Sequence, residues 1–293
     1  MLHTKMTKMD YIVEVILQLI GICICIVILY PILHMVAISL SAHEPVIRRE
    51  VQLIPKGLTF EAYKMVLSNA KIIRSFLNSI FIALAGCILS VSAVFLAAYP
   101  LACCKFPGKR FYNIYVLIPM WFGGGTIPTY LCMQKLGLVG SYGALIFGAL
   151  ISSYYVLITV SFLRGIPAEL TESARIDGAG EFRIMLQIIA PMSKAVLATI
   201  AIWVISAHWN SYMGPVIYIT NPEKYTLQQV LRAIVLEADM AAYDMSASGR
   251  DQANMAEQIR YAVLIVSMIP MTLVYPFAQK YFVKGVTLGA VKG

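Results

Sequence analysis

The chain has 293 residues, of which 59% are hydrophobic and only 13% charged, and its mean hydropathy is +0.76. A soluble domain of this size covers its core with about a quarter charged residues, so this composition excludes a soluble globular protein, a disordered chain and a coiled coil. The formal net charge of +8 would suit a nucleic-acid-binding protein, but the basic residues lie scattered between apolar runs. We therefore predict an integral membrane protein with no nucleic-acid partner, in which these charges set the orientation.

Apolar runs long enough to cross a bilayer, which takes about 20 helical residues, occur six times in the sequence. They cover residues 11–40, 77–104, 111–131, 141–163, 195–219 and 261–282. The first run is longer than the apolar part of a signal peptide, about 7–15 residues, so it predicts an uncleaved span. The expected fold is all-α with six transmembrane helices.

The spans divide the chain into three expected parts. Residues 1–76 would form an N-terminal span and an outer loop, residues 77–283 a core of five spans with a cytoplasmic loop at 164–194, and residues 284–293 a cytoplasmic tail. Basic residues crowd the short connection after the second run and lie at or beyond the end of the last run: Lys105, Lys109, Arg110, Lys280, Lys284 and Lys292. By the positive-inside rule, both termini are expected in the cytoplasm.

Acidic side chains are nearly absent from the predicted spans: Glu14 lies near the start of the first, and the second to sixth contain His208 but no Asp or Glu. A secondary transporter needs such groups at membrane depth to bind its coupling ion, so a secondary carrier or channel is disfavoured. The chain also lacks the Gly-x-x-x-x-Gly-Lys-Ser/Thr loop that binds ATP phosphates. Uphill transport would therefore need energy from another subunit. The six cysteines have no metal-ligand spacing, and neither a metal site nor a disulfide framework is predicted.

Two outer segments contain helical patterns. One is a short helix at 60–68, and the other is an amphipathic helix in the loop 220–259, with apolar residues at Leu227, Val230, Leu231, Ile234 and Val235.

The cytoplasmic loop 164–194 predicts a short helix, a turn and a second helix. Pro167 suits the first turn, Glu169 favours the positive N-terminal end, and Gly178 supplies a left-handed stop. Ile166, Leu170 and Ala174 would share one face of the first helix. From the residues alone, this helix either docks a cytoplasmic partner or lies on the lipid headgroups.

The spacing in this loop resembles the cytoplasmic signature of binding-protein-dependent ABC importer permeases: Glu-Ala-Ala, three residues, Gly, nine residues, Ile, one residue, Leu-Pro. Glu172, Ala174, Gly178, Ile188 and Pro191 fall in register, whereas Ser173 and Ala190 replace the consensus Ala and Leu. Five matches at fixed offsets have a chance of about 10⁻⁶ per starting point.

This resemblance implies a type I ABC importer permease fold and a non-enzymatic chain without a cofactor. Residues 169–177 would be the coupling helix that docks on the ATPase, and Pro191 would break the helix that enters the fifth span. The implied coupling residues are Glu169, Glu172, Ser173, Ala174, Asp177, Gly178 and Pro191. The implied partners are a second permease subunit, a cytoplasmic ATPase dimer and an extracytoplasmic solute-binding protein.

Other segments resemble narrower groups of the same permeases. The C-terminal residues 279–293 resemble the maltose-type carbohydrate branch, and residues 55–63 and 123–130 resemble a subgroup that takes up polysaccharide-derived oligosaccharides such as alginate. The resemblance implies a multi-pass protein of a bacterial cell membrane that carries oligosaccharides into the cytoplasm. A secondary carrier or channel, and a membrane anchor or sensor that docks a cytoplasmic partner, are the alternatives.

Sugars are bound by aromatic rings together with amide and hydroxyl groups, so residues of these types in the spans are candidates for the translocation path. The candidate path residues are Trp121, Trp203, His208, Trp209, Asn210 and Tyr212. Trp209 and Tyr212 would also suit an interfacial aromatic anchor, and the glycines at 123–125 would suit either a path-lining break or close helix packing. Tyr154 and Tyr155 are weaker path candidates.

Overall fold

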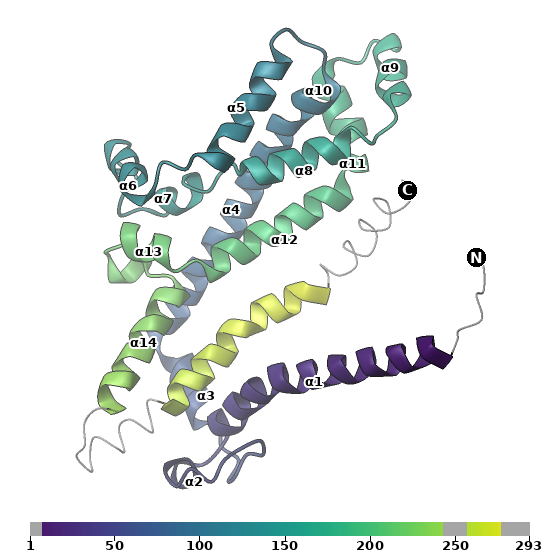
Figure 1. Cartoon of the computed structure of the whole chain (residues 1–293). Helices are drawn as coiled ribbons and strands as arrows, with labels where there is room; N and C mark the ends of the chain where they lie inside the picture. The colour runs from purple at the N-terminus through teal and green to yellow at the C-terminus, as the bar shows by residue number, and fades with distance from the viewer. Residues whose placement is uncertain (1–7, 243–256, 277–293) are drawn as a thin grey trace. The chain divides into compact units, whose positions relative to one another are not determined.

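The computed structural model describes residues 8–242 and 257–276, and these are predominantly helical (Figure 1). The chain divides into two compact units. Unit 1 comprises Met1–Asn69 and Leu231–Ser267, and unit 2 comprises Ala70–Val230 and Met268–Gly293.

Unit 1 contains the long helix α1 (Lys8–Ser39), which forms the first predicted span. None of the most apolar stretch of this helix is buried in the chain. Such a continuous apolar surface would be unfavourable in water, and it is the surface that a lipid-facing helix requires.

The end of α1 packs against the rest of unit 1. Short helices follow at α2 (His43–Ile47) and α3 (Glu61–Ser68), as predicted for 60–68. A further helix covers Glu257–Pro276, and its residues up to Ser267 belong to unit 1. The Gln258 amide donates a 2.9 Å hydrogen bond to the Ser41 carbonyl, and a small apolar core surrounds Val46. The part of the sixth predicted span beyond Pro276 lies outside the described residues.

Unit 2 is built around helix α4 (Ala70–Cys103), which packs chiefly against α12 (Lys194–Asn210) and α8 (Ser153–Leu163) (Figure 1). Their shared core contains fully buried side chains from all three helices: Val94, Ala98, Val156 and Ile200. Helix α4 begins earlier than predicted. Residues 70–76, expected in the outer loop, form its first two turns, because only Lys71 and Arg74 interrupt an otherwise helix-forming segment.

The remaining helices of unit 2 are short. They are α5 (Lys109–Trp121), α6 (Thr126–Lys135), α7 (Tyr142–Phe147), α9 (Ala168–Ile176), α10 (Glu181–Ile184), a π-helical turn (Met185–Ile189), α11 (Ala190–Met192), α13 (Met213–Tyr218) and a 3₁₀ turn (Pro222–Lys224). Helix α14 (Leu227–Ala242) begins in unit 2 and confirms the predicted amphipathic helix.

Among the described residues, three helices are long and apolar enough to cross a membrane, or up to five if each of two bent pairs is one span. The predicted run 111–131 is not one continuous helix, because α5 and α6 meet at an angle of 115° across the glycines 123–125. The run 141–163 is split between α7 and α8, and the run 195–219 between α12 and α13. Hydropathy detects these apolar runs but not the breaks within them.

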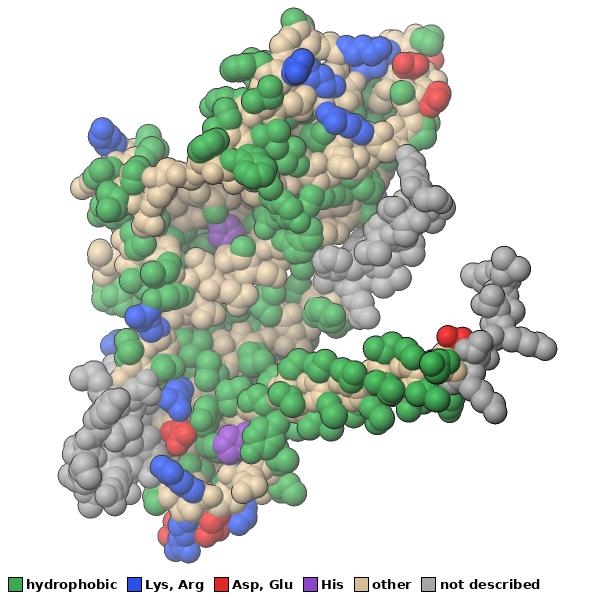
Figure 2. Space-filling model, in the orientation of Figure 1, with side chains coloured by type: hydrophobic (Ala, Val, Ile, Leu, Met, Phe, Trp, Pro, Cys, Tyr) green, Lys and Arg blue, Asp and Glu red, His purple; other side chains and the backbone are tan. Residues whose placement is uncertain are grey.

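Charged side chains gather at one end of unit 2. Figure 2 shows Lys and Arg side chains clustered where the start of α5, α9 and α10 lie, and acidic side chains on α9. Between the ends of the unit, the figure shows many apolar side chains and few charged ones. This distribution is the one expected of helices that cross a bilayer and end in water.

Candidate functional site

A cavity of about 410 Å³ lies inside unit 2, between α4, α6, α7, α8, α12 and α13. Its polar lining consists mainly of hydroxyl groups, together with one imidazole: Ser79, Thr129, Ser152, Tyr155, His208, Ser211, Tyr218 and Thr226. None of the described residues that line it is a Lys, Arg, Asp or Glu. The cavity therefore offers uncharged hydrogen-bonding groups and aromatic surface, the combination that suits a polyhydroxylated ligand.

His208 lies against the one glycine of α4, Gly86. A Cβ atom added at Gly86 would overlap the His208 ring, coming within 2.7 Å of Cδ2 and 3.0 Å of Cε1. Real Cβ atoms essentially never approach other atoms this closely. Only glycine at position 86 therefore leaves room for the imidazole in its present place at the cavity wall.

Aromatic rings flank one side of the cavity. The Trp203 ring stacks on Tyr155 with centroids 5.8 Å apart and on Tyr154 with centroids 6.1 Å apart. Tyr155 itself lines the cavity. This cluster joins α8 to α12 and places an aromatic face beside the hydroxyl groups.

The six predicted path residues are distributed unevenly around this cavity. His208 lines it, and Trp203 reaches it through Tyr155. Trp209 is 4% exposed and packs edge-on against Phe76, so its ring is a packing residue and the interfacial-anchor interpretation is wrong for it. Asn210 is exposed at the end of α12, Tyr212 is half-buried before α13, and Trp121 is 77% exposed on α5. Substrate contact by any of these residues stays a prediction.

Tyr155 was a weaker path candidate, but most of the hydroxyl lining was not predicted. Its residues come from segments far apart in the chain, and Ser and Thr in apolar helices often bond only to their own backbone. Nothing in the sequence distinguishes the hydroxyls that face the cavity from the hydroxyls that bond to their own helix.

The three glycines between α5 and α6 form an open break. No described residue lies within 4 Å of a Cβ built at Gly123 or Gly124, so close packing against the described helices does not explain these glycines. Gly125 has a φ of +84°, and the Thr129 hydroxyl donates a 2.7 Å hydrogen bond to its carbonyl. Because Thr129 lines the cavity, the break positions one of the lining hydroxyls.

The loop 164–194 forms the predicted helix, turn and second helix at one end of unit 2 (Figure 1). Pro167 is the N-cap of α9 rather than part of its first turn. The buried face of α9 consists of Thr171 and Ala174, whereas Leu170, predicted on that face, is 42% exposed. The Thr171 hydroxyl donates its hydrogen bond within the helix, to the Ala168 carbonyl at 2.9 Å.

The opposite face of α9 is exposed and combines apolar with acidic side chains. Ile176 is 86% exposed, and the other exposed residues are Glu169, Leu170, Glu172, Ser173 and Asp177. An isolated surface of this kind at the end of the unit suits a protein partner better than water.

Gly178 ends α9 as predicted, with a φ of +79°. The Ala179 N–H donates to the Ala174 carbonyl at 2.9 Å and the Gly178 N–H to the Arg175 carbonyl at 3.0 Å, the two bonds of a Schellman motif. Pro191 lies within α11, and the chain turns two residues later at Ser193, where the two helical arms form an angle of 79°. The predicted break therefore lies at Ser193. The π-helical turn lies just before Pro191, whose ring lacks an amide hydrogen and crowds the carbonyl four residues back.

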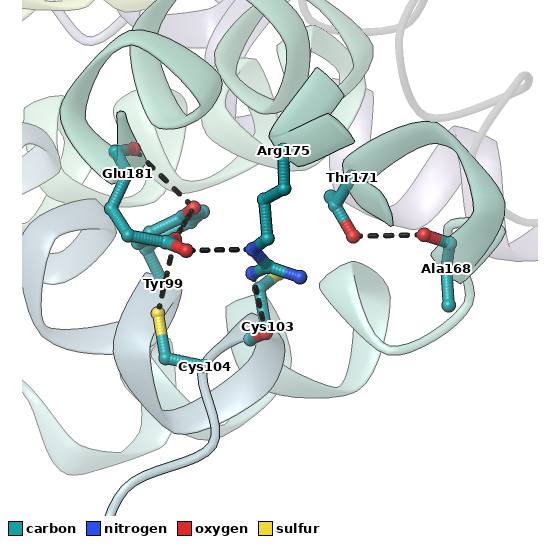
Figure 3. Close-up of polar contacts among 7 residues, drawn as sticks. All are labelled: Tyr99, Cys103, Cys104, Ala168, Thr171, Arg175 and Glu181. Atoms are coloured by element: carbon teal, nitrogen blue, oxygen red, sulfur yellow. Dashed lines mark hydrogen bonds and ion pairs between the residues drawn. The ribbon is translucent and has the colours of Figure 1, made fainter. Parts of the chain in front are cut away.

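A polar cluster joins α9 and α10 to the end of α4 (Figure 3). The Glu181 carboxylate accepts a 2.7 Å hydrogen bond from Arg175 Nε, through Oε1, and a 2.7 Å bond from the Tyr99 hydroxyl, through Oε2. These two hydrogen bonds, of which the one from Arg175 has the larger effect, lower the pKa of Glu181, so this carboxylate is ionised at neutral pH. This cluster was not predicted, because its partners are far apart in sequence.

At the other end of α4, hydrogen bonds hold the segment that leads into α14. The Asn78 amide donates to the carbonyls of Glu223 and Tyr225, both at 3.0 Å, and the Ser79 hydroxyl accepts from the Leu227 N–H at 2.8 Å. Buried Gln229 donates from Nε2 to the Pro215 carbonyl at 3.1 Å. The start of α14 is therefore fixed to both α4 and α13.

Comparison with known proteins agrees with this architecture. Residues 87–288 match the family described as "Binding-protein-dependent transport system inner membrane component". The chain is 36% identical over 263 residues to the polygalacturonan/rhamnogalacturonan transport system permease protein YtcP of Bacillus subtilis, covering 90% of this chain and 92% of that protein. It is 37% identical over 264 residues to protein LplC of the same organism, covering 90% of this chain and 89% of LplC.

A solved structure is similar over nearly the whole chain. It is the crystal structure of a bacterial ABC transporter involved in the import of the acidic polysaccharide alginate, with a TM-score of 0.87 and 27% identity, and it covers 95% of this chain and 99% of that one. With the loop 164–194, the apolar helices and the matched family model in agreement, the chain belongs to the family of inner membrane components of binding-protein-dependent transport systems.

Proposed function

We propose that this chain is the permease subunit of an ATP-driven importer that carries oligosaccharides from a solute-binding protein into the cytoplasm. The observation that carries the proposal is the exposed acidic and apolar face of helix α9. This helix contains the first residues of the motif that resembles the family signature, beginning at Glu172. As a member of its family, the chain is a membrane subunit and not an enzyme; a separate ATPase supplies the energy.

The proposed partners follow from the same surface. Helix α9 docks on one subunit of a cytoplasmic ATPase dimer, and a second, related permease subunit completes the pathway. The α9 end of unit 2 then faces the cytoplasm, together with both chain termini. The concentration of basic side chains at this end supports that orientation.

A variant on the exposed face of α9 tests the docking. Ile176→Ser should leave the fold intact, because the side chain is 86% exposed, yet lower uptake and solute-stimulated ATP hydrolysis. Leu58→Ser, at a 67% exposed position in unit 1, is the matched control and should change neither. Uptake by proteoliposomes that contain this chain without any ATPase would contradict the proposal and favour a secondary carrier. Membrane insertion without any ATP-dependent uptake would favour an anchor.

The proposed substrate is a uronate-containing oligosaccharide. The name of YtcP and the alginate importer structure both refer to acidic polysaccharides, which supports this class. The described lining of the cavity has no cation to pair with a carboxylate, so the sugar would bind through its hydroxyl groups and remain partly hydrated, or use cations of the second permease. The predicted outer segment 41–76 holds six basic against three acidic residues, a balance that would attract an acidic sugar.

Competition in ATP-dependent uptake decides the substrate class. Oligogalacturonate or alginate fragments should compete with a labelled oligouronate, whereas arabino-oligosaccharides should not. If only neutral sugars are carried, the substrate claim fails and the permease assignment stands. The arabinooligosaccharide permease AraQ of Bacillus subtilis, 28% identical to this chain over 270 residues, makes the neutral sugar a meaningful competitor.

The outer segment that contains α14 is proposed to contact the binding protein. Because Leu227 and Gln229 are buried, a test should keep them and replace 232–242 with a Gly/Ser segment of equal length. Stimulation by the loaded binding protein should be lost while assembly with the ATPase persists. Unchanged stimulation would instead indicate a helix that rests on the outer leaflet. The remainder of the predicted loop, 243–256, lies outside the described residues.

A further inference from the structure

We propose that Glu181 is a positioning residue for transport, whose carboxylate holds docking helix α9 to the end of α4 and so fixes the direction in which ATPase movements reach the spans. This proposal rests on the proposed function. Glu181 does not line the cavity and acts through Arg175 and Tyr99.

The carboxylate uses both oxygens, each for a different element (Figure 3). Oε1 accepts from Arg175 Nε, on the last turn of α9, at 2.7 Å. Oε2 accepts from the Tyr99 hydroxyl at 2.7 Å and from Cys104 Sγ at 3.6 Å, both at the end of α4. Because Glu181 is the first residue of α10, one side chain joins three segments.

Among the described residues, helix α9 itself makes little apolar contact with the spans. Its buried face consists of the small residues Thr171 and Ala174, and the Thr171 hydroxyl bonds within the helix itself. Two small side chains bury little apolar surface, so hydrophobic contact alone would hold the helix only weakly. The orientation of α9 must therefore depend strongly on its polar link.

The two ends of the link differ in rigidity. Tyr99 is 4% exposed and belongs to the core shared by α4, α8 and α12, so its hydroxyl is a fixed anchor. Arg175 and Glu181 are partly exposed, at 37% and 51% of their side chains. A solvent-exposed ion pair by itself contributes little to stability. The hydrogen bond from the buried Tyr99 hydroxyl to Glu181 connects this ion pair to the core of the membrane helices.

The basic groups around the site strengthen the same attachment. Arg175 also donates from its second terminal nitrogen to the Cys103 carbonyl at 3.5 Å, and Lys109 donates to the Cys104 carbonyl at 2.9 Å. These cations satisfy carbonyl groups that the end of a helix leaves unpaired. In Glu181→Gln the two cations would still bond to the carbonyls at the end of α4, but α10 would lose its charged hydrogen bond to Arg175.

The experiment uses the chain assembled with its ATPase and second permease in lipid nanodiscs. Variants Glu181→Gln and Tyr99→Phe should each speed amide hydrogen exchange in 168–177 by about tenfold, the effect of losing one charge-assisted hydrogen bond, while exchange in 109–121 stays unchanged. Tyr99→Phe keeps the ring in the core and guards against a Glu181 variant that fails to fold. Arg183→Gln is the matched control, because Arg183 Nε bonds to Gln187 on the same helical segment, at 2.9 Å.

The second readout is the amount of solute imported per ATP hydrolysed. A loosened docking helix should lower this ratio severalfold, whereas a loss of folded complex would lower uptake and hydrolysis together and leave the ratio constant. Unchanged exchange in α9, or an equal change in Arg183→Gln, overturns the proposal. Faster exchange with an unchanged ratio also overturns it, by reducing Glu181 to a structural role. If the wild-type assembly imports nothing with ATP, the proposed function fails, and exchange in α9 still decides whether the attachment exists.

Discussion

Adding one methyl group at Gly86 should displace His208 from the cavity wall. In Gly86→Ala the new Cβ would overlap the imidazole, with Cδ2 at 2.7 Å and Cε1 at 3.0 Å, so the ring or α12 must move. Overpacking of this kind typically costs about 1–3 kcal/mol. Replacing a helical glycine by alanine also stabilises a helix by up to about 1 kcal/mol, which would partly mask that cost.

A matched glycine separates the two effects. Gly21 on α1 has nothing within 4 Å of an added Cβ, so Gly21→Ala reports the helix preference without the overlap. We expect Gly86→Ala to be less stable than Gly21→Ala by about 1–3 kcal/mol, measured by denaturant unfolding in detergent. Uptake should fall in Gly86→Ala and remain normal in Gly21→Ala.

A double-mutant cycle then identifies the displaced group. His208→Ala removes the ring that the methyl group added at position 86 would meet, so the double variant should be more stable than the sum of the single effects predicts, by about 1–2 kcal/mol. Additive effects would show that Gly86 and His208 do not contact each other, and the assignment of His208 to the cavity wall would then be wrong.

Three further predictions concern the loop, the tryptophans and the outer segment. Gly178→Val should leave the chain inserted in the membrane but lower uptake and ATPase stimulation, because φ is +79° there and a left-handed residue with a side chain costs about 1–2 kcal/mol. Gly180→Val is the control, because φ is −70° at Gly180 and no described residue lies within 4 Å of a Cβ built at either glycine. The control should change neither uptake nor ATPase stimulation. Trp209→Ala should lower the free energy of unfolding by about 3–5 kcal/mol, because its ring is buried against Phe76, whereas Trp121→Ala at a 77% exposed site should change it little; equal effects would contradict the packing described. Asn78→Ala should speed hydrogen exchange at 221–226, because it removes the donor to two backbone carbonyls. Arg74→Ala should have a smaller effect on the same exchange, because the Arg74–Glu223 pair is largely exposed. The reverse order of the two effects would refute this account.

Hydropathy and motif spacing predicted the parts of this fold that depend on local sequence. Long apolar runs gave α1 and α4, and the α9–Gly178 unit could be predicted because a cap, a helix and a left-handed stop are all encoded within a few residues. The break between α7 and α8 was missed because residues 148–152 carry no charge that would interrupt the hydropathy.

The candidate site was less predictable, for a physical reason. His208 stands out because an imidazole in an apolar span requires an explanation, and it does line the cavity. The hydroxyls beside it resemble any Ser or Thr that bonds to its own helix. The Tyr99–Glu181 bond joins residues 82 positions apart, so only tertiary structure brings them together.

Helix α4 contacts each of the regions to which a function is proposed. Its 34 residues span about 50 Å at 1.5 Å per residue. Near its start Asn78 and Ser79 hold the segment before α14, in its middle Gly86 meets His208 at the cavity, and near its end Tyr99 binds Glu181. Pro100 follows Tyr99 and has no amide hydrogen, so the last turn of α4 lacks one helical hydrogen bond. Arg175 and Lys109 donate to the carbonyls of Ala102, Cys103 and Cys104, which the end of the helix leaves without helical partners. The end of α4 to which the docking helix is attached therefore depends on hydrogen bonds from other segments, and a displacement of α9 should change this end before it moves the rest of the helix.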